Sequence, residues 1–403
     1  MDWDPEFKPR LRRLEGFPLP GQDGQKFGLR DPSGLSKAVM TLSPGALQVM
    51  AMMDGANTCV AIQEICEARF QAQISTDVLL SMLNHLDEAH FLDGTGFDSY
   101  YKELLAQYRA RPFRELQYAS GLRIVDKNGK LFDDVLADAG DAQLPRPVVG
   151  LVAPHLDYPR GRPCYAAAYA TLRGRPAPKR VVILGTNHFG QSASVVATAS
   201  GFETPLGTTR TDVSFLEGLE ERCGSLRKYE LDHANEHSLE LQVAWLQHLF
   251  GPGSFEIVAF LCPDPCGPTG TAPQDGCGVD LSDFARALED LIAEDALDTL
   301  IVAGADLSHV GKAFGDERML DAAYLDEVRA RDRRALSQLE ANAPERWVSC
   351  IAEDNNRSNI CSAGCIYVLA TAVRSVSGKV LRYHQAVDQA SQTCVTCAAV
   401  AFA

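Results

Sequence analysis

The sequence predicts an α/β fold, with a mostly parallel central sheet flanked by helices and a small, mainly helical domain before it. From residue 147 onward, short apolar runs alternate with helical stretches. The runs are rich in Val, Ile and Leu: VVGLVAP, RVVILGTNH, FEIVAFLCP and DTLIVAGADLSH. Continuous apolar runs are typical of strands that are buried on both faces, as they are in parallel sheets. Before residue 95 the apolar residues instead recur at helical spacing.

The composition is that of a globular protein and disfavours several classes of partner. The chain has 403 residues, 46% of them hydrophobic, which is enough for two or three domains with a core. Its net charge of −15 disfavours nucleic acid as a partner, because phosphate binding needs clustered cations. The N-terminus lacks a signal-peptide pattern, and no apolar stretch approaches the roughly 20 residues that span a bilayer. We therefore expect a cytoplasmic protein that binds neither nucleic acid nor a membrane.

Residues 1–95 are expected to form the first domain. Three short helices are expected to start at Ser43-Pro44, Thr58 and Ser75-Thr76. HFLDGTG, from His90, would then begin a β-wing. Three helices with a wing form a winged-helix pattern, and LSPGALQVMAMMDGANTCVAIQEI and LLSMLNHLDEAHFLDG resemble the winged-helix domains of the pyrroloquinoline-quinone peptide-chaperone type. This resemblance implies a peptide or protein partner held at a strand edge, with an accessory packing domain as the alternative.

Residues 96–146 are interpreted as a connecting segment, and residues 147–403 as the second, α/β domain. In the connecting segment, DSYYKELLAQYRARPF favours a helix, whereas LRIVDKNGKLF favours a hairpin that turns at Asn128-Gly129. In the second domain, CPDPCGPTGTAPQDGCGVD (262–280) is too rich in Gly and Pro for regular structure. The sequence contains neither GxGxxG nor GxxxxGK[ST], so no nucleotide cofactor is expected.

Histidines follow the predicted strands directly. VVGLVAP ends at His155, VVILG leads through TNH to His188, and LIVAG leads into ADLSH, which contains Asp306 and His309. Ligands bind at the carboxyl ends of strands in open α/β sheets. Core packing explains one such histidine, but it gives no reason for three. Because neutral imidazole is both the commonest metal ligand and the usual acid/base near neutral pH, the pattern predicts a metal or proton-transfer site.

Two pairs of cysteines are further candidates. In RSNICSAGC, Cys361 precedes small residues and an apolar helix that begins near Ile366. A thiolate is favoured at a helix N-terminus, so Cys361 is suited to metal binding or redox chemistry. Packing of a small apolar side chain explains a cysteine at this position equally well. Cys365 is the alternative sulfur ligand. The CVTC pair near the C-terminus lies in a predicted apolar strand and is interpreted as two buried thiols, with a functional pair as the alternative.

HANEH (233–237) matches the H-x-x-E-H pattern of one class of zinc peptidases. On a helix, His233 and His237 would bind zinc, with Glu236 as the general base. The clear amphipathic pattern begins only at Leu239, so a zinc peptidase is the less favoured alternative.

Six ordered motifs, APHLDY, ILGTNH, ETPLGT, EHSLELQ, ADLSH and NICSAG, resemble the Memo family over residues 148–403. The resemblance implies a fold similar to that of the class III extradiol ring-cleaving dioxygenases, which use a non-haem metal and dioxygen. It implies that His155, His188 and Cys361 are the metal ligands, with iron or copper as the metal and Fe(II) slightly favoured. It also implies catalytic roles in the same pocket for His309, Asp306 and His237, with Asp306 fixing the orientation of His309.

The expected function is therefore that of an oxidoreductase or oxygenase with a redox-active non-haem metal, acting on a small molecule or a peptide. A non-catalytic metal-binding or interaction module is the alternative. Because a thiolate in place of the usual carboxylate softens the site, copper(I) competes seriously with iron. Two features depart from the family pattern. Asp157 adds a carboxylate of unassigned role after His155, and CSAGC replaces CGxxP, which leaves the sulfur ligand open between Cys361 and Cys365.

Overall fold

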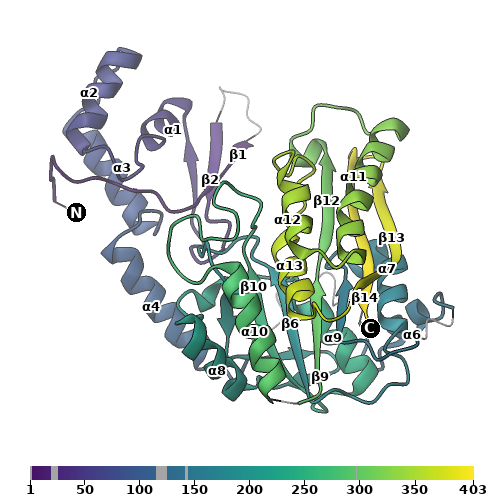
Figure 1. The fold of residues 1–403 in the computed structure, drawn as a ribbon. Coiled ribbons are helices and arrows are strands. Elements are labelled where there is room, and N and C mark those ends of the chain that lie inside the picture. Colours follow the sequence, from purple (N-terminus) through teal and green to yellow (C-terminus); the bar gives the residue numbers. More distant parts are fainter. Residues whose placement is uncertain (1, 20–25, 115–124, 141–143, 296) are drawn as a thin grey trace. The chain divides into compact units, whose positions relative to one another are not determined.

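The structure is a computed structural model that describes residues 2–19, 26–114, 125–140, 144–295 and 297–403 (Figure 1). The chain divides into two compact units, Met1–Ala110 and Arg111–Ala403. Helix α4 (Thr95–Arg109) is the helix expected in the connecting segment, and it belongs to the first unit. Among the described residues, no helix is long and apolar enough to cross a membrane.

The N-terminal unit combines helices with a small antiparallel sheet. Its strands follow the chain order: β1 (Glu15–Leu19), β2 (Lys26–Arg30) and β3 (Val39–Leu42). Besides α4, its helices are α1 (Pro44–Met50), α2 (Cys59–Phe70) and α3 (Thr76–Glu88). Each of these three begins where it was predicted, because the side chains of Ser43, Thr58 and Ser75 accept hydrogen bonds from backbone N–H groups of the first turn.

The expected β-wing after α3 does not form as a hairpin. Leu92 makes an isolated bridge with Leu11, and α4 begins at Thr95, so the segment from His90 has only a few residues before it becomes helical. The strands of this unit instead precede its helices in the chain.

A mixed sheet of eight strands forms the centre of the C-terminal unit in the described part of the chain. Four neighbouring strands run parallel, in the order β5 (Gly150–Ala153), β11 (Thr299–Gly304), β6 (Arg180–Thr186) and β10 (Glu256–Cys262). Almost all of their residues are buried, as expected from the apolar runs. The prediction of a central sheet flanked by helices is confirmed.

The prediction of a mostly parallel sheet holds only for these four strands. The other four described strands are antiparallel to their neighbours: β7 (Val196–Thr198), β12 (Asp306–Gly311), β13 (Gly378–Asp388) and β14 (Thr393–Phe402). Strand β14 pairs with β13 along one side and with β12 and β5 along the other. Strand β14 is buried along nearly its whole length. It connects the antiparallel strands β12 and β13 to the parallel strand β5.

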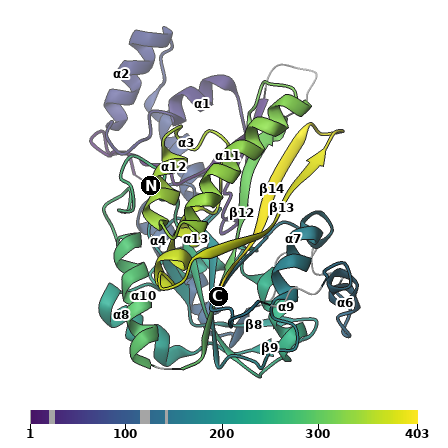
Figure 2. The ribbon, with the colours of Figure 1, turned by 45° about the vertical axis from the view of Figure 1, so that its right-hand side comes forward.

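Helices cover both faces of this sheet, as Figures 1 and 2 show. Alternate residues of each strand point to opposite faces. In β6, Val181 and Ile183 pack with α6 (Lys130–Leu136), α7 (Tyr158–Ala170) and α9 (Glu240–Phe250). Val182 and Leu184 pack on the other face, which is covered by α8 (Val213–Cys223), α10 (Leu281–Asp295), α11 (Ala322–Glu340), α12 (Pro344–Ala352) and α13 (Ala363–Ala372).

Smaller elements complete the C-terminal unit. A second sheet joins β4 (Phe113–Arg114), β8 (Gly201–Thr204) and β9 (Gly207–Thr209), and two 3-10 helices are η1 (Glu230–His233) and η2 (Lys312–Phe314). The hairpin expected around Asn128-Gly129 begins outside the described residues, at 122–124. Its second arm is helical, because α6 starts directly after Gly129. The segment after Cys262 up to residue 280 is irregular, as predicted.

Candidate metal centre

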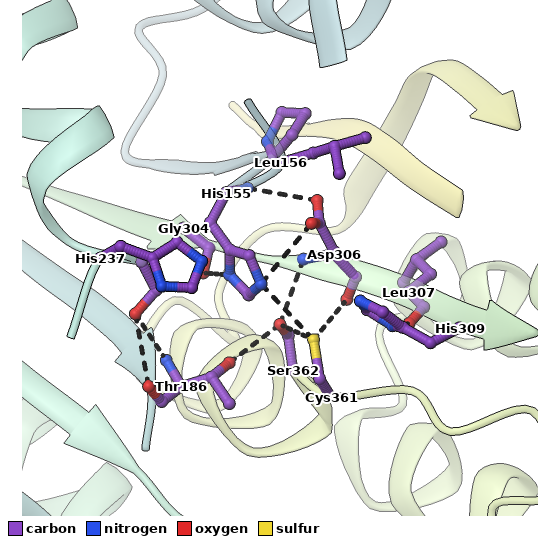
Figure 3. Close-up of polar contacts among 12 residues, drawn as sticks. His155, Leu156, Thr186, His237, Gly304, Asp306, Leu307, His309, Cys361 and Ser362 are labelled. Carbon is purple, nitrogen blue, oxygen red and sulfur yellow. Dashed lines mark hydrogen bonds and ion pairs between the residues drawn. The ribbon is translucent and has the colours of Figure 1, made fainter. Parts of the chain in front are cut away.

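The residues of the candidate site come from separate parts of the C-terminal unit. His155 and His188 each lie two residues beyond a parallel strand, β5 and β6 respectively. Cys361 precedes α13, and His237 lies between η1 and α9. Parallel strands end at one edge of the sheet, so their following loops meet there. Figure 3 shows His237 and Cys361 beside the ring of His155.

Three imidazoles form a possible metal-ligand group among the described residues. One ligand atom from each of His155, His188 and His237 lies within 4.8 Å of the other two. The ring centroids are 4.9 to 5.4 Å apart. Cys361 adds a sulfur, because its Sγ lies 3.5 Å from Nε2 of His155. The geometry therefore offers nitrogen and sulfur donors to one metal ion.

Hydrogen bonds fix which nitrogen of each ring faces the site. Nδ1 of His155 donates to the carbonyl oxygen of Gly304 at 2.9 Å, and Nδ1 of His188 donates to the carboxylate of Glu236 at 3.0 Å. A nitrogen that donates carries a proton, so Nε2 is the nitrogen of each ring that can offer its lone pair to a metal once it is deprotonated.

His309 and Asp306 adjoin this cluster, and each has a hydrogen-bond partner of its own. Both lie on β12, which pairs with β14, so His309 is held by a strand. Nδ1 of His309 donates to the carbonyl oxygen of Leu307 at 3.0 Å, and this bond orients the ring. The carboxylate of Asp306 lies 3.5 Å from Nε2 of His155 and accepts a hydrogen bond from its backbone N–H. Asp306 therefore belongs beside His155.

Glu236 is the buried anchor of two of the histidines. Its carboxylate accepts hydrogen bonds from the backbone N–H groups of His188, His237 and Ser238, and it also lies 3.4 Å from Nδ1 of His237. Burial alone would raise the pKa of Glu236, but the neighbouring imidazoles and N–H donors outweigh it and hold that pKa below its usual range. Glu236 is therefore a carboxylate that positions other groups.

The zinc-peptidase interpretation of HANEH is wrong in its structural premise. His233 is the last residue of η1, and α9 begins only at Glu240, so His233 and His237 do not share a helix. Nε2 of His233 donates to the carbonyl oxygen of Val196 at 3.0 Å, and burial lowers the pKa of this imidazole to about 3. His233 is a neutral residue of the core.

The two cysteines of CSAGC have different surroundings. Burial would raise the pKa of Cys361, but His155 and His188 stabilise its thiolate and bring the pKa to about 6. Cys365 is buried, and its Sγ lies 3.4 Å from the carbonyl oxygen of Ser362. Burial raises the pKa of Cys365 to about 12. Of the two sulfurs, Cys361 is the one suited to a metal.

The pKa values of His188, His237 and Asp306 are also shifted. Burial lowers the pKa of His188, but Glu236 and Cys361 outweigh it and leave that pKa well above its ordinary value. Burial lowers the pKa of His237 to about 3 and raises the pKa of Asp306 to about 6. Perturbed pKa values of this kind are common at functional sites.

The structure shows the surroundings of Asp157 and of the two CVTC cysteines. Asp157 is the N-cap of α7: its carboxylate accepts a hydrogen bond from the backbone N–H of Arg160 at 3.0 Å and pairs with the guanidinium of the same residue. The cysteines of CVTC are both buried, and they lie on opposite faces of β14: Cys394 packs with Val310, and Cys397 belongs to the core on the α7 side. Cys394 and Cys397 therefore do not face each other.

Several residues that support the site escaped the sequence prediction. Asp232 accepts hydrogen bonds from the side chain of Asn187 and from two backbone N–H groups of the loop that follows His188. The hydroxyl of Ser362 lies 3.2 Å from Sγ of Cys361 and accepts the backbone N–H of Asp306. The only sequence signal for them is their position beside the motif residues, since small polar residues are common in loops.

Fold and site together define a mixed α/β protein with a candidate metal centre of histidines and a cysteine at the carboxyl edge of its parallel strands. The family described as Memo-like protein matches residues 133–402. This chain belongs to the Memo family. Over 385 residues it is 25% identical to a MEMO1 family protein of Aquifex aeolicus, which covers 93% of this chain and 94% of that protein.

Other relatives align over a shorter part of this chain. A MEMO1 family protein of Methanopyrus kandleri is 29% identical over 238 residues, 58% of this chain and 75% of the relative. One of Thermotoga petrophila is 28% identical over 229 residues, 56% of this chain and 76% of the relative. The Aquifex alignment is long enough to include most of the N-terminal unit.

Proposed function

We propose that this Memo-family protein holds a redox-active non-haem metal, iron or copper, and acts as an oxidoreductase or oxygenase on a small molecule or a peptide. The proposed ligands are His155, His188 and Cys361. The observation that carries the proposal is the convergence of Nε2 of two imidazoles with a thiol whose Sγ lies 3.5 Å from one of them.

The donor set fits such a metal. Two imidazole nitrogens and one anionic sulfur suit iron and copper, and they leave coordination positions open for a substrate. The side chains of His188 and His237 are 18% and 21% exposed, so a small molecule reaches the cluster from solvent. When bound, the metal would supply electron transfer and activation of a ligand such as dioxygen.

The protein groups beside the ligands are proposed to handle protons. Nδ1 of His309 is held by Leu307, so Nε2 is free to take up or release a proton. The carboxyl group of Asp306, with its pKa raised to about 6, lies beside His155 and is a second acid/base candidate. His237 would line the substrate pocket.

The N-terminal unit is proposed to bind a peptide or protein partner. The support is its resemblance to winged-helix peptide chaperones and the position of β1 and β3 as the outer strands of its described sheet. An outer strand offers backbone groups to an extended peptide. Pull-down of a partner by the full chain should be lost when residues 1–110 are deleted, while the metal content stays; retained pull-down contradicts this part of the proposal.

Elemental analysis of protein purified without an affinity tag tests the metal. The wild type should carry near-stoichiometric iron or copper, and a variant with both His155→Ala and His188→Ala should lose it. His85→Ala is a matched control, because His85 is an exposed histidine of the N-terminal unit. Equal metal in the wild type and the double variant would refute the site.

Oxygen consumption separates an enzyme from a non-catalytic metal-binding module. The metal-loaded protein should consume oxygen with at least one catechol-type or peptide substrate, and Cys361→Ala should consume none. A protein that binds its metal and never consumes oxygen is the non-catalytic module.

A further inference from the structure

We infer that a cavity of the C-terminal unit, separate from the candidate metal centre, binds a small zwitterion with the chemistry of a free amino acid. The cavity lies among α10, α12, the end of α13 and the irregular segment after Cys262, and its volume is about 530 Å³. Figures 1 and 2 show α10, α12 and α13 on one face of the large sheet. Small-molecule sites are concave spaces of this order of size. The proposed metal ligands do not line this cavity.

Two guanidinium groups line the cavity, those of Arg286 on α10 and of Arg374 just beyond the end of α13. The Arg286 group donates to the carboxylate of Asp283 at 2.7 Å and to the hydroxyl of Ser282 at 3.1 Å. The Arg374 group pairs through Nε with Glu289 at 3.0 Å. A guanidinium has five N–H donors, so these partners fix each group and leave donors for a ligand. Planar guanidinium groups suit a carboxylate.

A carboxylate of the protein lines the same cavity. Glu345 is an exposed residue in the first turn of α12, and its side chain forms no ion pair with a described residue. The charges of Glu345 and Arg286 both act on the phenol of Tyr367, so groups of opposite charge face one part of the cavity. A ligand with a carboxylate for the arginines and an ammonium group for Glu345 satisfies both, whereas a simple anion leaves Glu345 beside it.

The buried part of the lining offers hydroxyl groups and apolar surface. Tyr367 and Thr371 of α13 are 4% and 2% exposed. Oγ1 of Thr371 is buried and makes no hydrogen bond of normal geometry with a described residue, and the phenol of Tyr367 is a polar neighbour. A buried hydroxyl without such a bond costs free energy, which a polar ligand group recovers. Val348 and Ala352 of α12 line the same cavity, so the ligand should also carry a short aliphatic part.

Calorimetric titration of the full chain with L-leucine tests the inference. A metal chelator is present throughout, so that chelation of a metal by the amino acid adds nothing. Two matched probes each lack one charge: isocaproate is leucine without its ammonium group, and isoamylamine is leucine without its carboxylate. L-leucine should bind at least about 10-fold more tightly than either probe, because each probe loses one charge-assisted interaction.

Two variants assign the charges of the ligand to the protein. Arg374→Gln should weaken leucine and isocaproate by about 10-fold or more and change isoamylamine by less than about 3-fold. Glu345→Gln should weaken leucine and isoamylamine by about 10-fold or more and change isocaproate by less than about 3-fold. The matched controls lie outside the cavity and should change no affinity: Arg222→Gln removes an exposed arginine that also pairs with one glutamate, and Glu317→Gln removes an exposed glutamate.

Three results would overturn the inference. The first is a wild type that does not bind leucine. The second is isocaproate binding as tight as that of leucine, since the cavity would then recognise only an anion. The third is leucine binding that both variants retain at full affinity, which would place the amino acid elsewhere on the protein. Each leaves the proposed metal site in place, because the substituted residues are not among the proposed metal ligands.

Discussion

At the scale of single residues, the charge of Glu236 is the most consequential buried feature of the site. It is 1% exposed, and its partners are imidazoles and backbone N–H groups. An amide at this position would present an NH2 group to some of those N–H donors. The orientation of His188 therefore depends on the carboxylate.

Glu236→Gln should weaken metal binding by about 10- to 100-fold, because it removes the partner that holds Nδ1 of His188 and His237. Chelator competition measures this loss. Glu230→Gln is the matched control: Glu230 is an equally buried carboxylate of η1 that bonds Thr198 and the backbone of Ala199, and its loss should leave metal affinity unchanged. Equal effects of the two variants would mean that Glu236 supports only the fold.

The sequence predicted some site residues well and others poorly, for a physical reason. His155 and His188 were found because the ends of parallel strands in one sheet meet at the same edge. His237 and Glu236 lie in an irregular segment, and only packing against the loop after β6 brings them to the same edge. The helical spacing of HANEH predicted a zinc site formed by His233 and His237 on one helix. The role of Glu236 in orienting His188 is seen only from its contacts.

At the scale of elements, the start of α13 determines where Cys361 lies. Gly364 is in the first turn, and a Cβ built on it would lie 2.0 Å from the carbonyl oxygen of Pro263. The helix can approach the end of β10 this closely only with glycine at that position. This contact explains why the fourth residue of CSAGC, Gly364, is a glycine.

Gly364→Ala should therefore lower the free energy of unfolding by about 1–3 kcal/mol and reduce metal content, since the helix start must move away. Urea denaturation measures the first effect. In the control, Gly218→Ala in α8, the new Cβ meets only Leu291 at 3.4 Å, and stability should stay the same or rise by up to about 1 kcal/mol. A Gly364→Ala variant as stable as the wild type would show that α13 tolerates the shift.

Helix α11 is tied to three antiparallel strands by one buried carboxylate. Asp332 accepts hydrogen bonds from Ser308 on β12, Tyr383 on β13 and Thr396 on β14, at 2.6 to 2.8 Å. Burial raises the pKa of Asp332 to about 6. The folded state thus favours the protonated acid more than the unfolded chain does, which stabilises the protein at low pH.

A pH titration of stability should show this effect. The contribution of Asp332 is fully present below about pH 4 and is lost as the pH rises through about 6, a change on the order of 2–3 kcal/mol. Asp332→Asn does not titrate. The difference in unfolding free energy between wild type and Asp332→Asn should therefore shrink between pH 4 and pH 7; a constant difference would contradict the raised pKa.

The elements also show where sequence patterns stop being informative. Apolar runs identified the four parallel strands, because burial on both faces leaves a continuous pattern. The polar DLSH segment has no such pattern and was expected only to follow the strand formed by LIVAG. It is a strand because β14, some 90 residues further along, pairs with it, and pairing between distant segments leaves no local signal.

At the scale of the whole molecule, the two units have separate cores. The apolar cluster of the N-terminal unit runs from Leu29 to Leu92, and the clusters that pack against the large sheet run from Val125 to Phe402. All residues of the candidate metal centre lie in the second unit. The family match, residues 133–402, lies there as well.

A chain of residues 111–403 should therefore fold alone and bind its metal as tightly as the full protein. A separate core is what allows a domain to fold independently. Thermal unfolding of the fragment should show one cooperative transition. Its metal affinity should match that of the full chain within about 3-fold, because the fragment keeps the proposed ligands and the residues that hydrogen-bond them. The fragment carrying His155→Ala and His188→Ala is the control for non-specific metal. A fragment that folds but binds metal more than about 10-fold more weakly would mean that the first unit tunes the centre, and a fragment that does not fold would mean that the two cores depend on each other.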